Sequence, residues 1–184
     1  IVPPLVANFR AIPLAACYPT DITVVENLAT GDEFEWTVID EAGRISATSN
    51  ANLPIFSIPN PGKYTVILVS SNSFTGQQSA PSVKDIEIFE TPIASFEVRP
   101  TTVFIPDQEI TTFNFSSGAN QYDWDFGDDN TSIDFEPKIT YKVEGEYPIQ
   151  LVAGFNNGSR DVDGDGILDG SIVCYDTLVR SVQA

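Results

Sequence analysis

The feature of the chain best suited to chemistry is a run of alternating aspartates near its C-terminal end. Asp161, Asp163, Asp165 and Asp169 lie within nine residues and are interleaved with two glycines. Calcium prefers six to eight hard oxygen ligands, and alternate Asp residues on a tight loop supply them. Four like charges this close together repel one another unless a cation offsets them. The spacing therefore predicts a calcium site, and the alternative is a solvated acidic hairpin loop.

The stretch 161–169 resembles the D-x-D-x-D-G-x-x-D calcium loops of EF-hand, dockerin and thrombospondin type-3 repeats. The resemblance implies that Gly166 occupies the sharp-turn position and that Ile167 offers its backbone carbonyl. It also implies that Asp169 binds directly or through water. One position departs from the EF-hand pattern, because the twelfth residue is Ile172 where an EF-hand has a bidentate Glu. We therefore expect a modest affinity, or a further carboxylate that completes the shell.

The chain has two cysteines, Cys17 and Cys174, one in each half. An even number of cysteines in a secreted protein favours a disulfide. In an antiparallel sandwich, the turn with Cys17 would lie at the end of the first domain that faces the second. The hairpin before Cys174 would face back toward the first domain. We therefore expect an interdomain bridge that stiffens the same joint as the calcium loop, and the alternative is two buried or unpaired thiols.

Several classes of function lack the residues they need. The absence of histidine excludes Ser-His-Asp and Cys-His catalysis and imidazole ligands for zinc. No glycine-rich phosphate loop precedes a helix. A glycosidase that uses only carboxylates would need a substrate groove, for which two compact sandwiches offer little room. We therefore expect a protein that is not an enzyme.

The charge balance narrows the choice of partners. A net charge of −17 argues against nucleic acid and anionic membrane surfaces as partners. No apolar run approaches the roughly 20 residues needed to span a bilayer, so we expect no membrane insertion. The chain contains no Met, which indicates a mature or excised fragment whose targeting must be inferred indirectly.

An internal repeat organises the chain. Three pairs of segments match at offsets of 87, 88 and 83, namely 7–13 with 94–100, 34–36 with 122–124, and 61–69 with 144–152. A period this long without helices indicates two copies of one sandwich, not a solenoid. We place the domains at residues 1–91 and 92–184. Almost no flexible linker separates them, which predicts a fairly stiff rod.

Each repeat is rich in short segments of β-branched and aromatic residues bounded by turn residues, which predicts strands. The expected strands are 5–12, 21–27, 33–40, 54–58, 63–70 and 82–89, then 93–99, 109–116, 121–126, 138–141, 146–153 and 173–182. Trp36 and Trp124 are expected to fill the two cores. The predicted fold class is all-β, with two tandem immunoglobulin-like antiparallel β-sandwiches.

The stretch 122–129, Tyr-Asp-Trp-Asp-Phe-Gly-Asp-Asp, resembles the W-D-F-G-D-G signature of the polycystic-kidney-disease (PKD) domain family. The segments 136–137, 139–141 and 145–147 also agree with that pattern, whereas Asp129 replaces the usual second glycine. The resemblance covers residues 92–184 well. It is weaker over residues 1–91, which keep Trp36, Pro61-Gly62 and Tyr64 but have no D-F-G-D stretch.

The resemblance implies an immunoglobulin-like sandwich found on cell surfaces and beside secreted hydrolases. The ending Cys174–Val179 is similar to PKD repeats of large Bacteroidetes surface proteins, including gliding-motility adhesins exported by type IX secretion. Within the signature, Asp125, Gly127 and Asp128 fall where the chain must turn, and Asp and Gly are the residues that turns require. A catalytic carboxylate pair is the alternative, but turn aspartates are far commoner.

The sequence thus predicts an extracellular, non-catalytic module of a bacterial cell-surface protein. We expect a stiff spacer or stalk, associated with adhesion or gliding motility, whose partners are neighbouring domains of a larger protein. The alternative is an accessory module of a secreted hydrolase that binds a polysaccharide or a surface protein. A row of exposed aromatics would favour that alternative; most aromatics fall on core positions, with Phe74 and Phe155 as possible loop exceptions.

Overall fold

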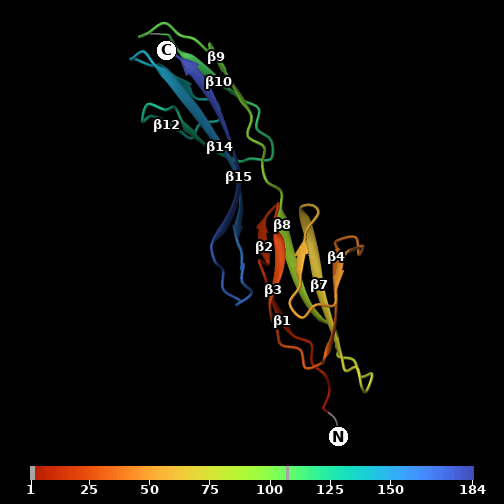
Figure 1. The fold of residues 1–184 in the computed structure, drawn as a ribbon. Helices are drawn as coiled ribbons and strands as arrows, with labels where there is room; N and C mark the ends of the chain where they lie inside the picture. Colours follow the sequence, from red (N-terminus) through yellow and green to blue (C-terminus); the bar gives the residue numbers. More distant parts are fainter. Residues whose placement is uncertain (1–2, 107) are drawn as a thin grey trace. The chain divides into compact units, whose positions relative to one another are not determined.

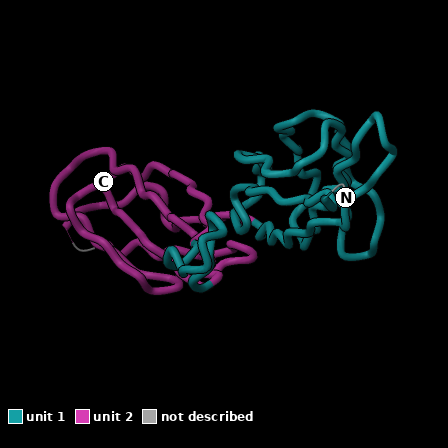
Figure 2. Tube along the Cα trace, turned by 90° about the horizontal axis from the view of Figure 1, so that it is seen from below, with its two compact units in different colours: residues 1–90, 158–172 teal, residues 91–157, 173–184 magenta. Residues whose placement is uncertain are grey.

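The computed structural model describes residues 3–106 and 108–184, and every regular element within them is a β-strand. Figure 1 shows their order along the chain. The chain splits into two compact units, coloured separately in Figure 2. Unit 1 comprises residues 1–90 and 158–172, and unit 2 comprises residues 91–157 and 173–184.

Unit 1 is built from two sheets. A three-stranded sheet has the order β1-β3-β6, and a five-stranded sheet has the order β2-β8-β7-β4-β5. The strands are β1 (Phe9–Ile12), β2 (Ala15–Cys17), β3 (Asp21–Asn27), β4 (Glu33–Asp40), β5 (Ile45–Ser49), β6 (Ile55–Ser57), β7 (Gly62–Ser71) and β8 (Ser82–Phe89). All pairs are antiparallel except β2 with β8, which run parallel.

The opening strand of unit 1 is split, and this corrects the expectation of one strand over residues 5–12. The chain pairs with β3 as far as Ile12 and then joins the other sheet at Ala15. Pro13 lies between them and has no backbone N–H to continue a ladder. Cys17, expected in a turn, therefore lies at the end of strand β2.

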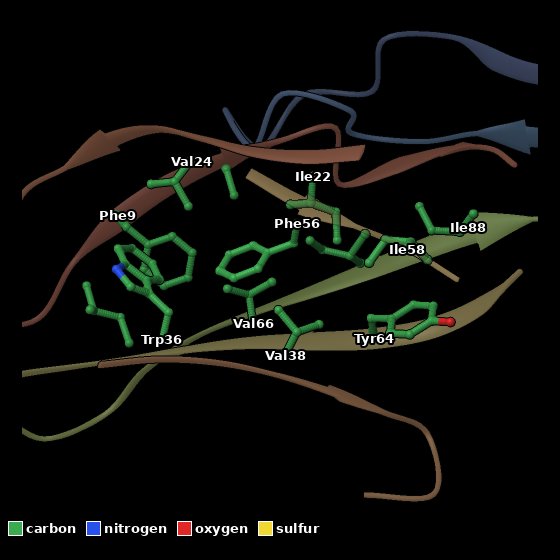
Figure 3. Close-up of a cluster of buried hydrophobic side chains, with 13 residues drawn as sticks. Phe9, Ile22, Val24, Trp36, Val38, Phe56, Ile58, Tyr64, Val66 and Ile88 are labelled. Atoms are coloured by element: carbon green, nitrogen blue, oxygen red, sulfur yellow. The ribbon is translucent and has the colours of Figure 1, made fainter. Parts of the chain in front are cut away.

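The core of unit 1 lies between its two sheets, as Figure 3 shows. Period-2 alternation along β7 turns Tyr64, Val66 and Leu68 inward, and none of them is more than 5% exposed. Trp36 of β4 is fully buried, and its ring meets the edge of Phe9 from β1 at a centroid distance of 5.0 Å. The indole N–H donates to the carbonyl of Ala51 at 2.8 Å, so the buried polar atom is satisfied.

Unit 2 repeats this plan with shorter edge strands. Its sheets have the orders β13-β10-β9 and β12-β11-β14-β15. The strands are β9 (Phe96–Arg99), β10 (Ile110–Asn114), β11 (Gln121–Asp125), β12 (Thr131–Ser132), β13 (Lys138–Ile139), β14 (Glu146–Ser159) and β15 (Ser171–Gln183). The last two are long, and the hairpin loop that joins them belongs to unit 1.

The core of unit 2 is built around the same aromatic pair as the core of unit 1. Trp124 is 1% exposed and meets Phe96 edge-on at a centroid distance of 5.0 Å, as Trp36 meets Phe9. Its indole N–H donates to the carbonyl of Asp134 at 2.9 Å. The same pair of aromatic rings thus fills the same place between two sheets in both units.

The chain is all-β and its sheets pack as immunoglobulin-like sandwiches. Three strands, β2, β5 and β12, were not expected from the sequence, because none carries a strong apolar alternation. The expected domain division at residue 91 differs from the two units in one segment, 158–172. Among the described residues, no helix has the length and apolarity that a membrane crossing requires.

Candidate metal centre

The predicted calcium loop connects β14 to β15 and is part of unit 1. Within it, the N–H of Arg160 donates to the carbonyl of Gly170 at 3.1 Å, and the N–H of Asp169 donates to the carbonyl of Arg160 at 2.9 Å. These two bonds close the base of the loop, so residues 161–168 form a defined turn.

Side-chain oxygens of the aspartates organise the turn. Both carboxylate oxygens of Asp161 accept backbone N–H groups, from Gly164 at 2.7 Å and from Gly166 at 2.9 Å. Asp169 accepts the N–H of Val162 at 2.7 Å. Gly166 has a φ of 88°, a conformation that residues with a Cβ rarely adopt. The sharp turn therefore lies at Gly166, where the resemblance to calcium loops predicts it.

Three of the four aspartates converge. One carboxylate oxygen each from Asp161, Asp163 and Asp169 lies within 4.8 Å of the other two. Asp165 is not in this group; its carboxylate accepts the N–H of Ile167 at 2.7 Å instead. The Ile167 side chain is apolar and 68% exposed, so only the backbone carbonyl of Ile167 can serve as a ligand. A set of three close carboxylates beside further carbonyls fits the hard oxygen chemistry of calcium.

The base of the loop is held against the strands of unit 1. The N–H of Leu14 donates to the carbonyl of Val162 at 2.8 Å, and the N–H of Glu87 donates to the carbonyl of Leu14 at 2.9 Å. The Arg160 guanidinium lies 3.4 Å from the Glu87 carboxylate and 5.4 Å from the centre of the Phe89 ring. The loop is thus joined to β8 by backbone and side-chain contacts together.

The contacts of Leu14, Glu87 and Arg160 that hold the loop were not predicted from the sequence. Arg160 immediately precedes the first aspartate, and a single base beside four acids was the available signal. Leu14 and Glu87 carry no such signal, because their contacts join segments that lie far apart in the sequence. Only the tertiary structure identifies them.

Neither cysteine is a free thiol. Both Cys17 and Cys174 are disulfide-bonded, and the Cys174 side chain is buried. The Nδ2 of Asn157 lies 3.5 Å from the Cys174 sulfur.

The signature turn after β11 uses its carboxylates for local structure. Asp125 accepts the N–H of Gly127 at 2.8 Å, and Asp128 accepts the N–H of Asn130 at 3.2 Å. Gly127 has a φ of 74°, and Asp129, where the family pattern has its second glycine, has a φ of 67°. These carboxylates terminate a strand and shape a turn.

Tyr141 fastens this turn to the core. Its hydroxyl donates to the carbonyl of Phe126 at 2.8 Å, and the residue is 2% exposed. Burial raises the pKa of the Tyr141 hydroxyl well above its usual value, and the negative charge of Asp128 raises it further. The phenol is therefore a permanent donor at any physiological pH.

Aromatic exposure differs from the expectation. Phe74 is 96% exposed in a loop as predicted, whereas Phe155 lies in strand β14 and is 38% exposed. Unit 2 also exposes four aromatics that were not anticipated: Phe104, Phe115, Phe135 and Tyr175. Alternation alone does not reveal which face of a strand remains uncovered.

The strand order, the paired sheets and the buried Trp define an immunoglobulin-like β-sandwich module. Residues 91–167, which are less than half of the chain, match a family model described as the PKD domain. No curated protein matches the chain. The match supports an immunoglobulin-like PKD domain in the second half of the chain; a second one over residues 1–91 stays a prediction.

Solved structures of two or more β-sandwich domains are similar to the chain. An amphioxus IgVJ-C2 molecule is 10% identical, with 92% of this chain and 99% of that chain covered and a TM-score of 0.38. A two-domain fibronectin type-III segment from chicken tenascin is 12% identical, with 97% and 98% covered and a TM-score of 0.41. The four N-terminal Ig domains of Dscam1 isoform 8.4 are 14% identical, with 88% and 41% covered and a TM-score of 0.31.

Proposed function

We propose that the chain is a non-catalytic structural module of a secreted or cell-surface bacterial protein, acting as a stiff spacer or stalk. One observation carries the proposal: the polypeptide passes between the two units three times, after residues 90, 157 and 172. A simple tandem pair has one such connection. Additional connections restrict the independent movement of two domains. A spacer that transmits force or sets a distance requires this restriction.

Calcium would strengthen this arrangement. Asp161, Asp163 and Asp169 would hold the ion, with the carboxylate of Asp165 and the carbonyl of Ile167 as further oxygen donors. The ion would offset the repulsion among four close carboxylates. The contact between Leu14 and Val162 and the Arg160–Glu87 ion pair then join an ordered loop to unit 1.

A bridge between Cys17 and Cys174 would add a covalent link. Both residues are disulfide-bonded, and disulfides persist in oxidising compartments outside the cytosol. This supports an extracellular location. The resemblance to Bacteroidetes surface repeats makes an adhesin or a gliding-motility protein exported by type IX secretion the proposed context, with neighbouring domains of the same protein as partners.

The decisive experiment measures calcium binding and thermal stability of the full chain. Isothermal calorimetry should detect one calcium site, and calcium should raise the melting temperature relative to chelator. The double variant Asp161→Asn/Asp163→Asn should lose both effects. The control Glu144→Gln/Glu146→Gln removes two exposed acids of unit 2 and should retain them. Absence of binding heat and of any melting shift in the unmodified chain contradicts the calcium part of the proposal.

Small-angle scattering tests the spacer itself. A stiff module gives one maximum dimension and a profile that a single conformation fits, in calcium and with the disulfide intact. A profile that requires a broad ensemble under these conditions contradicts the spacer proposal, whatever the calorimetry shows.

The exposed aromatics of unit 2 favour one second candidate, an accessory module that binds a polysaccharide or a surface protein. Phe104 is 84% exposed and Tyr175 is 64% exposed, and aromatic faces of this kind stack on sugar rings or enter protein pockets. Binding of the labelled chain to a polysaccharide panel, lost on Tyr175→Ser, would support this candidate over the spacer.

A further inference from the structure

The loop between β7 and β8 presents an aromatic side chain on a rigid turn. The Asn72 side-chain oxygen accepts the N–H groups of Phe74 at 3.1 Å and of Thr75 at 2.9 Å. The Asp32 carboxylate accepts both the N–H and the hydroxyl of Ser73, at 2.8 and 2.6 Å. Phe74 itself is 96% exposed. The turn therefore fixes the position of a large apolar side chain that contributes nothing to the core.

Hydrogen bonds tie this turn to the other segments at the same end of unit 1. The N–H of Asp32 donates to the carbonyl of Ser71 at 3.0 Å, the N–H of Thr30 donates to the carbonyl of Val6 at 3.0 Å, and the amide of Asn27 donates to the Asn52 side chain at 2.9 Å. We call this end the Phe74 pole, formed by residues 3–8, 27–32, 51–54 and 71–78. Figure 1 shows these segments at the end of unit 1 nearest the label N.

The Phe74 pole combines exposed apolar side chains with few charged residues. Each of four apolar residues there is at least half exposed: Val6, Leu28, Leu53 and Phe74. The four segments contain one charged residue, Asp32, whose carboxylate accepts two hydrogen bonds from Ser73. The exposed Glu33 borders them and accepts the Ser71 hydroxyl at 3.1 Å. The whole chain carries a net charge of −17. Depletion of charge with exposure of aromatic and aliphatic groups is the pattern of an interface core.

The missing charge indicates the kind of partner. A basic partner is attracted and steered by acidic groups, so a surface that binds one retains them. An acidic partner is repelled by them, and a neutral surface removes that repulsion. The pole thus permits a partner that is itself acidic, as a second domain of this type is.

The internal repeat points to the same partner. The hairpin β7–β8 corresponds to the hairpin β14–β15, because Tyr64 and Tyr147 are equivalent at an offset of 83. The tip of β14–β15, residues 158–172, belongs to the compact body of a β-sandwich through the bond between Leu14 and Val162. We propose that the tip of β7–β8 likewise packs against a β-sandwich, that of a second copy of the chain. Phe74 would be the anchor residue of this contact.

Sedimentation equilibrium of the full chain, from micromolar to millimolar concentration, tests this proposal. We expect weak reversible self-association, because the patch is small. The variant Phe74→Ser should weaken it about tenfold or more, as removal of an anchor residue does. The control Phe104→Ser removes an equally exposed phenylalanine of unit 2 and should change it less than about twofold. Added salt should strengthen association, since it screens the remaining repulsion between acidic copies.

Three outcomes overturn the proposal: a chain that stays monomeric at millimolar concentration, equal effects of the two substitutions, or binding to a neutral polysaccharide that depends on Phe74. Because Phe74 is almost fully exposed, Phe74→Ser should leave the melting temperature unchanged, which shows that the variant is folded. Association should be the same in calcium and in chelator, so its failure is distinguishable from failure of the calcium proposal.

Discussion

The backbone N–H of Leu14 donates a 2.8 Å hydrogen bond to the carbonyl of Val162, although the two residues lie at opposite ends of the sequence. Leu14 connects two strands of unit 1, and Val162 is the second residue of the acidic loop. This bond, together with the Arg160–Glu87 ion pair, makes the loop part of a sandwich whose other residues all precede residue 91. The loop therefore has two roles to test, as a cation site and as an anchor.

Arg160→Ala should loosen the acidic loop without unfolding unit 1. The ion pair to Glu87 is 3.4 Å long and partly exposed, and the contact with Phe89 adds a cation–π interaction. Together they contribute on the order of 1 kcal/mol. Hydrogen exchange of residues 158–172 should accelerate. Arg99→Ala, which breaks an exposed ion pair with Glu97, is the matched control and should leave exchange in the loop unaltered.

Removal of the disulfide should lower stability more than any surface substitution. Peptide mapping under non-reducing conditions should recover Cys17 and Cys174 in one linked pair of peptides. Cys17→Ser/Cys174→Ser should then destabilise the chain by about 2–5 kcal/mol, measured by denaturant unfolding. Recovery of both residues as free thiols from secreted material would refute the pairing.

Gly127→Ala should be more damaging than a substitution at another glycine with positive φ. A Cβ at Gly127 would lie 2.8 Å from the Pro148 ring and 2.9 Å from its carbonyl oxygen, and the φ of 74° adds backbone strain. We expect a loss of about 2 kcal/mol or more. Gly43 has a φ of 76° with no atom within 4 Å of a Cβ, so Gly43→Ala reports the strain alone, about 1 kcal/mol.

Asp129→Gly should stabilise unit 2 slightly. Asp129 has a φ of 67°, and glycine adopts this conformation without the steric penalty of a Cβ. The greater freedom of glycine in the unfolded chain offsets part of the gain, so we expect an increase of up to about 1 kcal/mol in thermal or denaturant unfolding. A decrease would show that the Asp129 side chain makes a contribution of its own.

Tyr141→Phe should remove a stabilising bond and alter the behaviour at alkaline pH. Loss of the bond to the Phe126 carbonyl leaves a buried acceptor without its donor, which costs about 1–3 kcal/mol. The pKa of Tyr141 is raised in the folded state, so the folded chain retains its proton where the unfolded chain loses it. The stability from Tyr141 is therefore complete below about pH 10 and declines as pH rises above it. The decline should be shallower in Tyr141→Phe.

The turn that presents Phe74 should depend on pH in the opposite sense. The hydrogen bonds from Ser73 hold the pKa of Asp32 below its ordinary value. A carboxyl with a lowered pKa contributes stability above its unfolded pKa and loses it as pH falls through the folded one. The protection of residues 72–77 against hydrogen exchange, corrected for the intrinsic pH dependence of exchange, should therefore fall only in acid. Asp32→Asn should show fast exchange at neutral pH, whereas Asp85→Asn should not.

Much of the fold was predictable because its signals are local. The alternation of Tyr64, Val66 and Leu68 predicted a strand with one buried face, and the repeat at offsets near 87 placed Trp36 and Trp124 at equivalent core positions. Turn residues are equally local: the sequence predicts turns at Gly127 and Gly166, whose φ values are 74° and 88°. Strand β2 was missed because a three-residue segment has too few positions to show a period.

The class of fold and the candidate calcium ligands follow from the sequence alone, because each depends on residues that are near neighbours along the chain. The tertiary structure alone decided that Asp165 stays outside the group formed by Asp161, Asp163 and Asp169. It also shows that the acidic loop is anchored in the first sandwich and that Phe74 lies at a pole with few charged residues. These are contacts between distant segments, which are fixed by how the sheets pack and leave no periodic trace in the sequence.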